Sequence, residues 1–322
     1  MSLELLLIKI LGGLFVAAVF GGIVFLLRFL YGPKGKFRDP EWDAWNERAK
    51  EELVRSENEK AETALREAFQ AYAESFFSGN AEEDAPLQLK VSHTFQVVRL
   101  AEKLAKREPA FADPELAHAL RVSALFHDVG RFEQFCRFHT FADNLSCNHG
   151  VLGARIIREQ HFLHRESQET RMLILAAVAA HNRLSVPQAL AGPLRPVLLG
   201  LRDADKLDIL RVMADNLAPG KRGDGTVLLH LKDEPESYSS AILQALEQGR
   251  VALYRDMRFY NDFRILLCTW LHDFHFPASF AIIKHRGYLS GVIDGIEALP
   301  ELRARLHAFV DETLERTSGV RG

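Results

Sequence analysis

The most constraining feature of this sequence is an apolar run that ends on two adjacent ionisable side chains. The run from Val122 to Phe126 leads directly into His127 and Asp128. The helix that it predicts is apolar nearly all round, so this helix must lie in the core. A histidine and an aspartate at its end must be paired or bound to a metal, because an isolated buried charge is costly. The sequence therefore predicts a polar site inside an apolar core.

Four further apolar stretches carry histidine or aspartate at positions that face the core of a helical protein. These residues are His93, His149, His181, Asp203 and Asp205. Each of them alone is compatible with a satisfied core side chain. Together with His127 and Asp128 they place imidazoles and carboxylates on five consecutive helices. This combination of ligands suits Fe, Mn, Zn, Co or Ni, so the pattern predicts a metal centre.

Almost every segment after residue 86 has the period and length of a helix, and no stretch alternates convincingly as a strand does. The sequence therefore predicts an all-α fold. Helices are expected at residues 87–107, 114–129, 151–159, 169–182, 194–217, 239–271, 279–289 and 301–316. Residues 42–77 are charged and Ala-rich and predict a long amphipathic stalk helix, and the acidic segment 79–86 is expected to be a loop.

Residues 10–27 carry no charge and lie between Lys9 and Arg28. At about 1.5 Å per residue they cross most of a hydrocarbon core roughly 30 Å thick, which predicts a transmembrane helix. A cleaved signal peptide is disfavoured, since no small-x-small cleavage site follows. Four basic residues between 28 and 38, against Lys9 alone before the run, predict a single-pass protein of the cell membrane with its body in the cytoplasm. Gly12-Gly13 and Gly21-Gly22 would let two such helices approach closely, so a homodimer is a weaker expectation.

Composition narrows the function classes. The formal net charge of -3 argues against broad nucleic-acid binding, which usually requires a basic surplus. The cysteines Cys136, Cys147 and Cys268 are widely spaced and form no CxxC motif, which favours a reducing compartment. Neither a P-loop nor a dinucleotide fingerprint occurs. A second His-Asp pair, His272-Asp273, is interpreted as a coincidence because no later aspartate follows it in an apolar helix.

The order His93, His127-Asp128 and Asp205, with the sequence His-Asp-Val-Gly-Arg at 127–131, resembles the HD-domain metal-dependent phosphohydrolase superfamily. The resemblance covers about residues 87–217 and implies an all-helical HD-domain bundle. It also implies that His93, His127, Asp128 and Asp205 hold a metal. Asp203 remains an alternative for the last ligand, because helical geometry does not separate it from Asp205.

Members of the superfamily with two metals add two histidines between the His-Asp pair and the last aspartate. His149 and His181 match those positions, so the resemblance implies two divalent ions with Asp128 as the bridge. The long synthetase domain of stringent-response enzymes is absent. The His-His-Glu feature of the cyclic-di-GMP phosphodiesterase branch is also absent, because Asn182 follows His181.

Two cations are candidates for contacts to phosphate oxygens. Arg131 follows the His-Asp pair closely, and a guanidinium fork suits phosphate. Lys206 adjoins Asp205, but an ordinary ion pair of Lys206 with Asp203 or Asp208 is equally compatible with the sequence. Asp208 could also form a hydrogen bond to a metal ligand without contacting the metal itself.

The chain is therefore expected to fall into a transmembrane anchor (1–31), a linker and amphipathic helix (32–86), an HD metal-binding domain (87–217) and a C-terminal helical extension packed on it (218–322). Its predicted activity is hydrolysis of a phosphate ester, such as a nucleotide, by a metal-activated hydroxide. Asp128, Arg131 and Lys206 are the predicted catalytic residues. The alternatives are a membrane-tethered sensor or scaffold that binds a nucleotide or partner without turnover, and a di-iron oxygenase on the same ligands.

Overall fold

The computed structural model describes residues 21–26, 29–30, 40–217 and 231–318. Within these residues the chain consists of helices and loops, and its one isolated β-bridge joins Lys232 to Phe259 without forming a strand. The prediction of an all-α fold is confirmed for this part of the chain. Two compact units are present, at residues 1–64 and 65–322.

The helix bounds follow the chain in order. The α-helices are α2 (Pro40–Glu74), α3 (Ala81–Arg107), α4 (Pro114–Phe126), α5 (Gly130–Phe138), α6 (His149–Glu159), α7 (Gln168–Ala180), α8 (Leu194–Leu217), α9 (Ser240–Glu247), α10 (Tyr260–Thr269), α11 (Pro277–Arg286), α12 (Tyr288–Asp294) and α13 (Pro300–Ser318). Short 3-10 helices lie at η1 (Pro109–Phe111), η2 (Asp143–Leu145), η3 (Tyr254–Asp256) and η4 (Trp270–Asp273).

The predicted transmembrane anchor falls mostly outside the described residues. Of residues 1–31, only 21–26 and 29–30 are described, and they are helical. No helix in the described part of the chain is both long enough and apolar enough to cross a membrane. The prediction of a single-pass cell-membrane protein is therefore corrected: the longest described helix, α2, is charged along its length and cannot serve as a span. The predicted homodimer and the predicted domain boundaries stay predictions.

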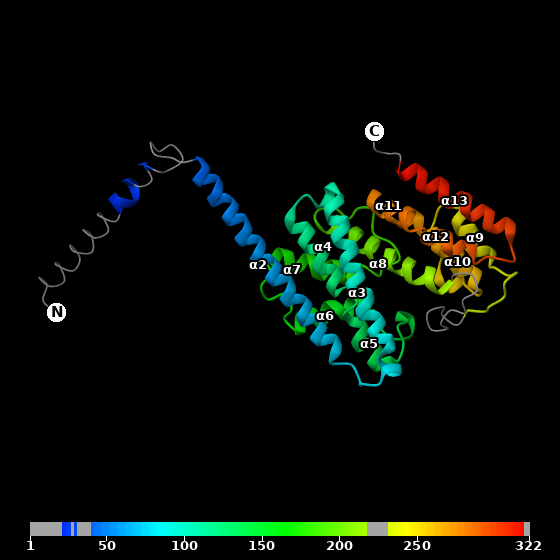
Figure 1. Cartoon of the computed structure of the whole chain (residues 1–322). Helices are drawn as coiled ribbons and strands as arrows, with labels where there is room; N and C mark the ends of the chain where they lie inside the picture. Colours follow the sequence, from blue (N-terminus) through cyan, green and yellow to red (C-terminus); the bar gives the residue numbers. More distant parts are fainter. Residues whose placement is uncertain (1–20, 27–28, 31–39, 218–230, 319–322) are drawn as a thin grey trace, which may run out of the picture. The chain divides into compact units, whose positions relative to one another are not determined.

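In the second unit, α8 is the helix that two groups of helices share. On one side α4 packs against α3, α7 and α8, while α6 packs on α7 and α5 on α6. On the other side α11 and α12 contact α8, and α9, α10 and α13 pack around them. Figure 1 shows α8 between the cyan and green helices and the yellow to red helices of the C-terminal group. Large apolar side chains such as Phe69, Phe126 and Leu207 are fully buried between these helices.

Two predicted helix ends were wrong, each for a local reason. Helix α3 begins at Ala81 rather than at residue 87, because the Asn80 side chain accepts a hydrogen bond from the Glu82 amide and caps the helix. The next helix, α4, ends at Phe126 instead of running to residue 129, and Gly130 begins α5 instead of ending α4. A side chain on Gly130 would meet the backbone of His149 and Gly153, so α5 can lie against α6 only with glycine here.

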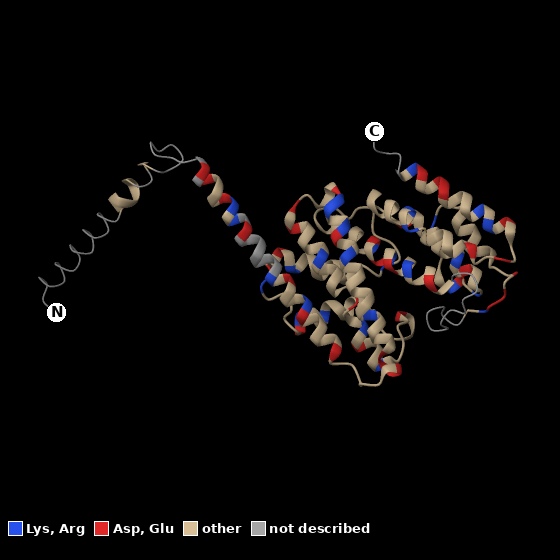
Figure 2. Cartoon of the chain, viewed as in Figure 1, with Lys and Arg blue, Asp and Glu red and all other residues tan. Residues whose placement is uncertain are grey.

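The predicted single helix at 239–271 was also wrong. The segment forms α9, η3, α10 and η4 instead. Asp262, which is fully buried, accepts hydrogen bonds from the amides of Ser239, Arg258 and Phe259 and thereby fixes the loop between the helices. Figure 2 shows acidic and basic positions interspersed along the described helices. The predicted absence of nucleic-acid binding stays a prediction.

Candidate metal centre

The predicted ligands come from five different places in the fold, and the structure brings them together. His93 lies within α3, His127 and Asp128 in the turn after α4, His149 at the start of α6, His181 just after α7, and Asp205 within α8. All are buried except Asp205, which is partly exposed. They form two groups of three whose ligand atoms lie within 4.8 Å of one another.

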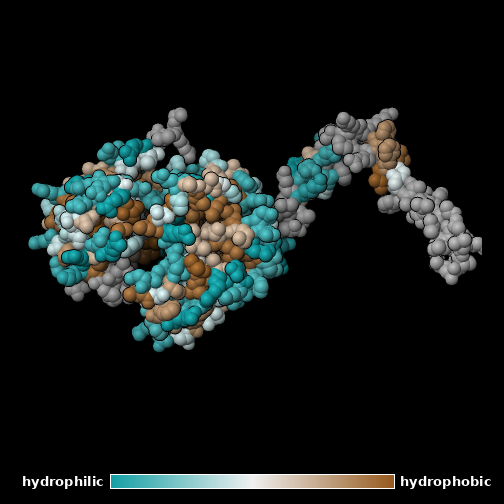
Figure 3. All heavy atoms as spheres, turned by 180° about the vertical axis from the view of Figure 1, so that it is seen from behind, coloured by the Kyte–Doolittle hydropathy of each residue, from teal (hydrophilic) through white to brown (hydrophobic). Residues whose placement is uncertain are grey.

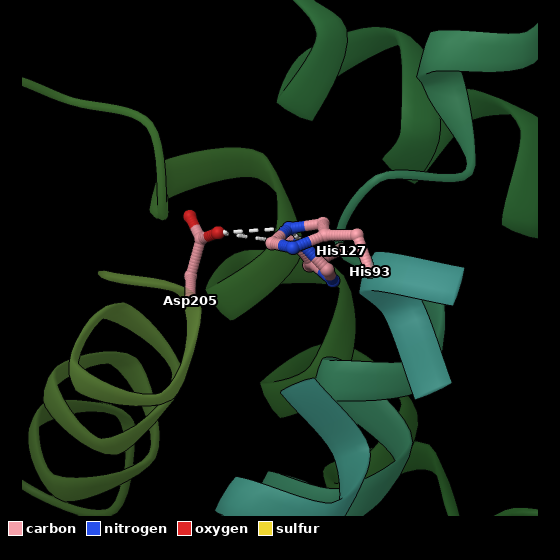
Figure 4. Close-up of side chains that lie close together, drawn as sticks. All are labelled: His93, His127 and Asp205. Carbon is pink, nitrogen blue, oxygen red and sulfur yellow. Dashed lines mark hydrogen bonds and ion pairs between the residues drawn. The ribbon is translucent and has the colours of Figure 1, made fainter. Parts of the chain in front are cut away.

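The first group consists of His93, His127 and Asp205. The Nε2 atom of His93 lies 3.1 Å from Asp205 Oδ1 and 3.3 Å from Nε2 of His127. Figure 4 shows the carboxylate of Asp205 facing both imidazole rings from α8. Two nitrogens and an oxygen thus converge on one point, as the ligands of a transition metal do.

The second group consists of Asp128, His149 and His181. The Nε2 atoms of His149 and His181 are 3.1 Å apart, and Oδ1 of Asp128 lies 3.3 Å from Nε2 of His149. Asp128 also faces the first group, because its other oxygen, Oδ2, is 3.8 Å from His93 Nε2 and 3.7 Å from His127 Nε2. One carboxylate therefore presents one oxygen to each group, which is the arrangement of a bridging ligand.

Hydrogen bonds at Nδ1 of three imidazoles decide which ring nitrogen carries the proton. The Nδ1 atoms of His127 and His181 lie 2.8 and 2.7 Å from the carbonyl oxygens of Ala124 and Val178, and Nδ1 of His149 lies 2.8 Å from the carboxylate of Asp143. A carbonyl and a carboxylate only accept hydrogen bonds, so these Nδ1 atoms carry the proton and the Nε2 atoms of the neutral rings carry a lone pair.

Two such lone pairs face each other across the 3.1 Å between His149 and His181. They repel unless a cation lies between them and Asp128. The imidazole and carboxylate donors, the Nε2 lone pairs that point inward and the repulsion between His149 and His181 all fit a divalent metal ion. The residues present therefore suit the metals that the sequence pattern predicts.

Carboxylates outside the two groups orient the histidines. Asp208 lies 2.7 Å from Nδ1 of His93, as its place three residues after Asp205 suggested. Asp143, in η2, contacts Nδ1 of His149 and also accepts hydrogen bonds from Gln134 and Asn182. Such partners fix ring orientation and raise ligand basicity. Sequence reasoning missed Asp143, because a loop residue shows no periodicity that could reveal its contacts.

Two cations lie beside the carboxylate of Asp128. Lys90 Nζ donates to Asp128 Oδ2 at 2.8 Å, and Arg131 Nε lies 3.4 Å from Asp128 Oδ1. Both cations also lie against the ring of Phe141, at 5.3 and 5.9 Å from its centroid. Lys90 was missed from the sequence, although its place one helical turn before His93 was a usable signal. Arg131 additionally donates to Asp143, so it helps to orient His149 through that carboxylate.

Asp203 and Lys206 do not join the two groups. Asp203 is fully buried and accepts hydrogen bonds from the amides of His275 and Phe276 and from the Ser279 hydroxyl. The structure thus separates it from Asp205, which the sequence could not do. Lys206 forms an ion pair with Asp273, the second residue of the other His-Asp pair. Its predicted contact to phosphate stays a prediction.

The charge states favour metal binding near neutral pH. Burial lowers the pKa of His149 and of His181 to about 4 and also lowers that of His127, so these rings are neutral. Burial opposes the charge on Asp128 too, but the neighbouring Lys90 holds its pKa well below the usual range. His93 differs: its hydrogen bonds to Asp205 and Asp208 outweigh burial and raise its pKa to about 9. A metal ion must displace that proton.

Part of the candidate centre remains exposed to solvent. The side chains of Asp205, Lys90 and Arg131 keep 21, 19 and 15 % of their surface exposed, whereas the imidazoles are nearly inaccessible. Figure 3 shows that the face seen from behind is hollowed between the helices around α3 and the C-terminal group. Contact with solvent at the centre is thus concentrated on Asp205, Lys90 and Arg131.

Comparison with known proteins gives one result. Residues 91–217 match the family model described as HD domain. No curated protein matches the chain, and neither does any solved structure. The matched region contains all six residues of the two groups.

Proposed function

This chain belongs to the HD metal-dependent phosphohydrolase superfamily, and we propose that it hydrolyses a phosphate ester with the help of two divalent metal ions. The observation that carries the proposal is the position of Asp128. Its two carboxylate oxygens face different three-residue groups, and each group offers imidazole nitrogens.

The residues would divide between two ions in the same way. His93, His127 and Asp205 would hold one ion, His149 and His181 the other, and Asp128 both. Two ions about 3.5–4 Å apart activate a water molecule and neutralise charge on a phosphoryl group. Two carboxylates that lie outside the two groups hold the imidazoles in place. Asp208 fixes the ring of His93, and Asp143 fixes the ring of His149.

Charge beside the centre supports a phosphate substrate. Arg131 and Lys90 place two cations within hydrogen-bonding or ion-pair distance of Asp128, on the side of the centre that is accessible to solvent. They would offset the negative charge that grows on the phosphoryl oxygens in the transition state. Lys206 could join them only after leaving Asp273. A nucleotide is the substrate class that we favour, on the resemblance alone.

The test is metal analysis of the purified full chain together with turnover of a panel of phosphate esters. The proposal expects about two ions per chain and metal-dependent release of phosphate or of a phosphorylated product. Less than one ion per folded chain would refute the metal centre. Two ions without cleavage of any ester, including nucleotides, would refute the hydrolase and favour binding without turnover.

A further inference from the structure

We propose that Asp273 is a positioning residue of the metal centre. It acts through Arg202 on His181 and through Lys206 on Asp205, which belong to different groups of the centre. This proposal rests on the proposed two-metal function. It assigns a role to the C-terminal helices, which lie outside the region matched to the HD domain.

The carboxylate of Asp273 binds two cations of α8. Its Oδ2 atom accepts a hydrogen bond from Arg202 Nη2 at 2.8 Å and also contacts Lys206 Nζ, which donates to the backbone oxygen of Asp273 at 2.8 Å as well. The side chain of Arg202 is only 5 % exposed and that of Lys206 12 %. Buried cations need a counter-ion, and Asp273 supplies it to both.

The first connection leads to His181. Arg202 Nη1 donates to the backbone oxygen of His181 at 2.8 Å and also to that of Arg183. These carbonyls lie just beyond the end of α7, where the last carbonyl oxygens of a helix have no partner within it. The guanidinium therefore fixes the backbone that carries His181, and Asp273 fixes the guanidinium.

The second connection leads to Asp205. Lys206 follows Asp205 on α8 and is held against Asp273, with its ammonium 5.6 Å from the centroid of the Phe274 ring. Asp203 strengthens this attachment, because it accepts hydrogen bonds from the amides of His275 and Phe276, just before α11, and from the hydroxyl of Ser279 in its first turn. Helix α8 is thus bound to residues 273–279 at three positions around Asp205. These bonds set the rotation of α8 and hence the direction of the Asp205 carboxylate.

Metal titration of the Asp273→Asn variant tests the proposal. Asparagine keeps the shape but removes the charge that Arg202 and Lys206 share. We expect both ions to bind roughly 10–100-fold more weakly, the usual cost of losing a partner outside the coordination sphere. The matched control is Asp294→Asn, which removes an exposed carboxylate of the C-terminal helices that pairs with the partly exposed His307 at 2.9 Å. This control should bind both ions as the wild type does.

A spectroscopic signal separates positioning from general loss of stability. In the protein loaded with Co²⁺, the visible absorption bands report the geometry of the ligands, and Asp273→Asn should shift them. Asp273→Glu, which retains the charge, should restore most of the affinity and the band positions. Weaker binding with unshifted bands and no rescue by glutamate would overturn the proposal.

The remaining outcomes are also decisive. Wild-type affinity and bands in Asp273→Asn would overturn the positioning role and leave the proposed function intact. A wild-type chain that binds no metal would refute the proposed function itself. If Asp273→Asn does not fold, Lys206→Gln replaces it: shifted bands support the connection to Asp205, and unshifted bands overturn it.

Discussion

The chain contains two His-Asp pairs, and they differ in burial of the histidine and in the number of imidazoles around the aspartate. At His127-Asp128 both side chains are buried among three other imidazoles and Asp205. At His272-Asp273 the histidine is exposed and packs on Phe309, while the aspartate pairs with Arg202 and Lys206. A His-Asp dipeptide alone therefore does not define a candidate metal site. Both aspartates pair with a lysine and an arginine, so what distinguishes the two is the convergence of several imidazole nitrogens on Asp128.

The largest expected difference between the two pairs is in metal content. In the proposed centre His127→Ala and Asp128→Ala each remove one ligand, and Asp128→Ala removes the carboxylate that would contact both ions. We expect Asp128→Ala to bind less than one ion per chain and to lose at least about 10³-fold in turnover, since stabilisation of transition-state charge is commonly worth 10²–10³-fold or more per group. His272→Ala should keep both ions. Metal analysis and ester turnover of the three variants would check this, and metal loss in His272→Ala would break the comparison.

The second difference is in stability. Asp203 binds the backbone next to the second pair, and Asp203→Ala leaves its buried donors without an acceptor. We expect the free energy of unfolding to fall by about 3–5 kcal/mol, the range for breaking a buried charged interaction. Asp205→Asn, two residues away, should cost about 1 kcal/mol in the metal-free protein. Denaturant unfolding of both variants measures this, and equal losses would contradict the division of roles between the two aspartates.

A smaller effect, on metal affinity alone, should follow from substitution of Asp143, which orients His149 beside Asp128. Asp143 holds His149 through Nδ1, and no comparable carboxylate orients His272 among the described contacts. Asp143→Asn should weaken the binding of the ion at Asp128, His149 and His181 by about 10–100-fold and leave the other ion almost unchanged. Calorimetric titration resolves the two events. Equal weakening of both would show that Asp143 does not act through His149.

The last expected effect is the dependence of metal-free stability on pH. His149 and His181 have pKa values of about 4 in the folded chain, below the value of about 6.5 expected for unfolded histidine. Between these values the unfolded chain binds more protons, so the free energy of unfolding should fall as the pH falls from 6.5 to 4, by up to about 1.4 kcal/mol per pH unit for each ring.

The raised pKa of His93 has the opposite sign, since its stabilisation is lost only as the pH rises through about 9. It therefore adds no slope in the acid range. Thermal unfolding between pH 4 and 7 would reveal the slope, and His272→Ala serves as the control that should retain it. A flat profile would contradict the buried neutral state of His149 and His181.

Much of the fold and of the candidate site could be predicted because it depends on local pattern. The helical periodicity of the apolar residues places His93, His149, His181 and Asp205 on faces directed toward the core. Helix α8 also has the predicted bounds. Helix ends were predicted less well, since the cap of α3 by Asn80 and the contact of Gly130 with α6 depend on single side chains and on tertiary packing.

The interactions that could not be predicted join residues far apart in the sequence. Asp273 meets Arg202 across 71 positions, and Lys90 meets Asp128 across 38. No period of the sequence encodes such a pairing, because it depends on how the helices pack. Helical geometry left the choice between Asp203 and Asp205 open for the same reason: both face apolar neighbours on α8, and only the position of α11 separates their contacts.

The most direct test of the two-metal centre is an anomalous difference map from crystals of the metal-loaded chain. The account predicts two peaks about 3.5–4 Å apart. One should lie beside His93, His127 and Asp205, the other beside His149 and His181, with the carboxylate of Asp128 between them. A single peak that Asp128 does not contact, or no peak at these residues in a folded chain, would contradict it.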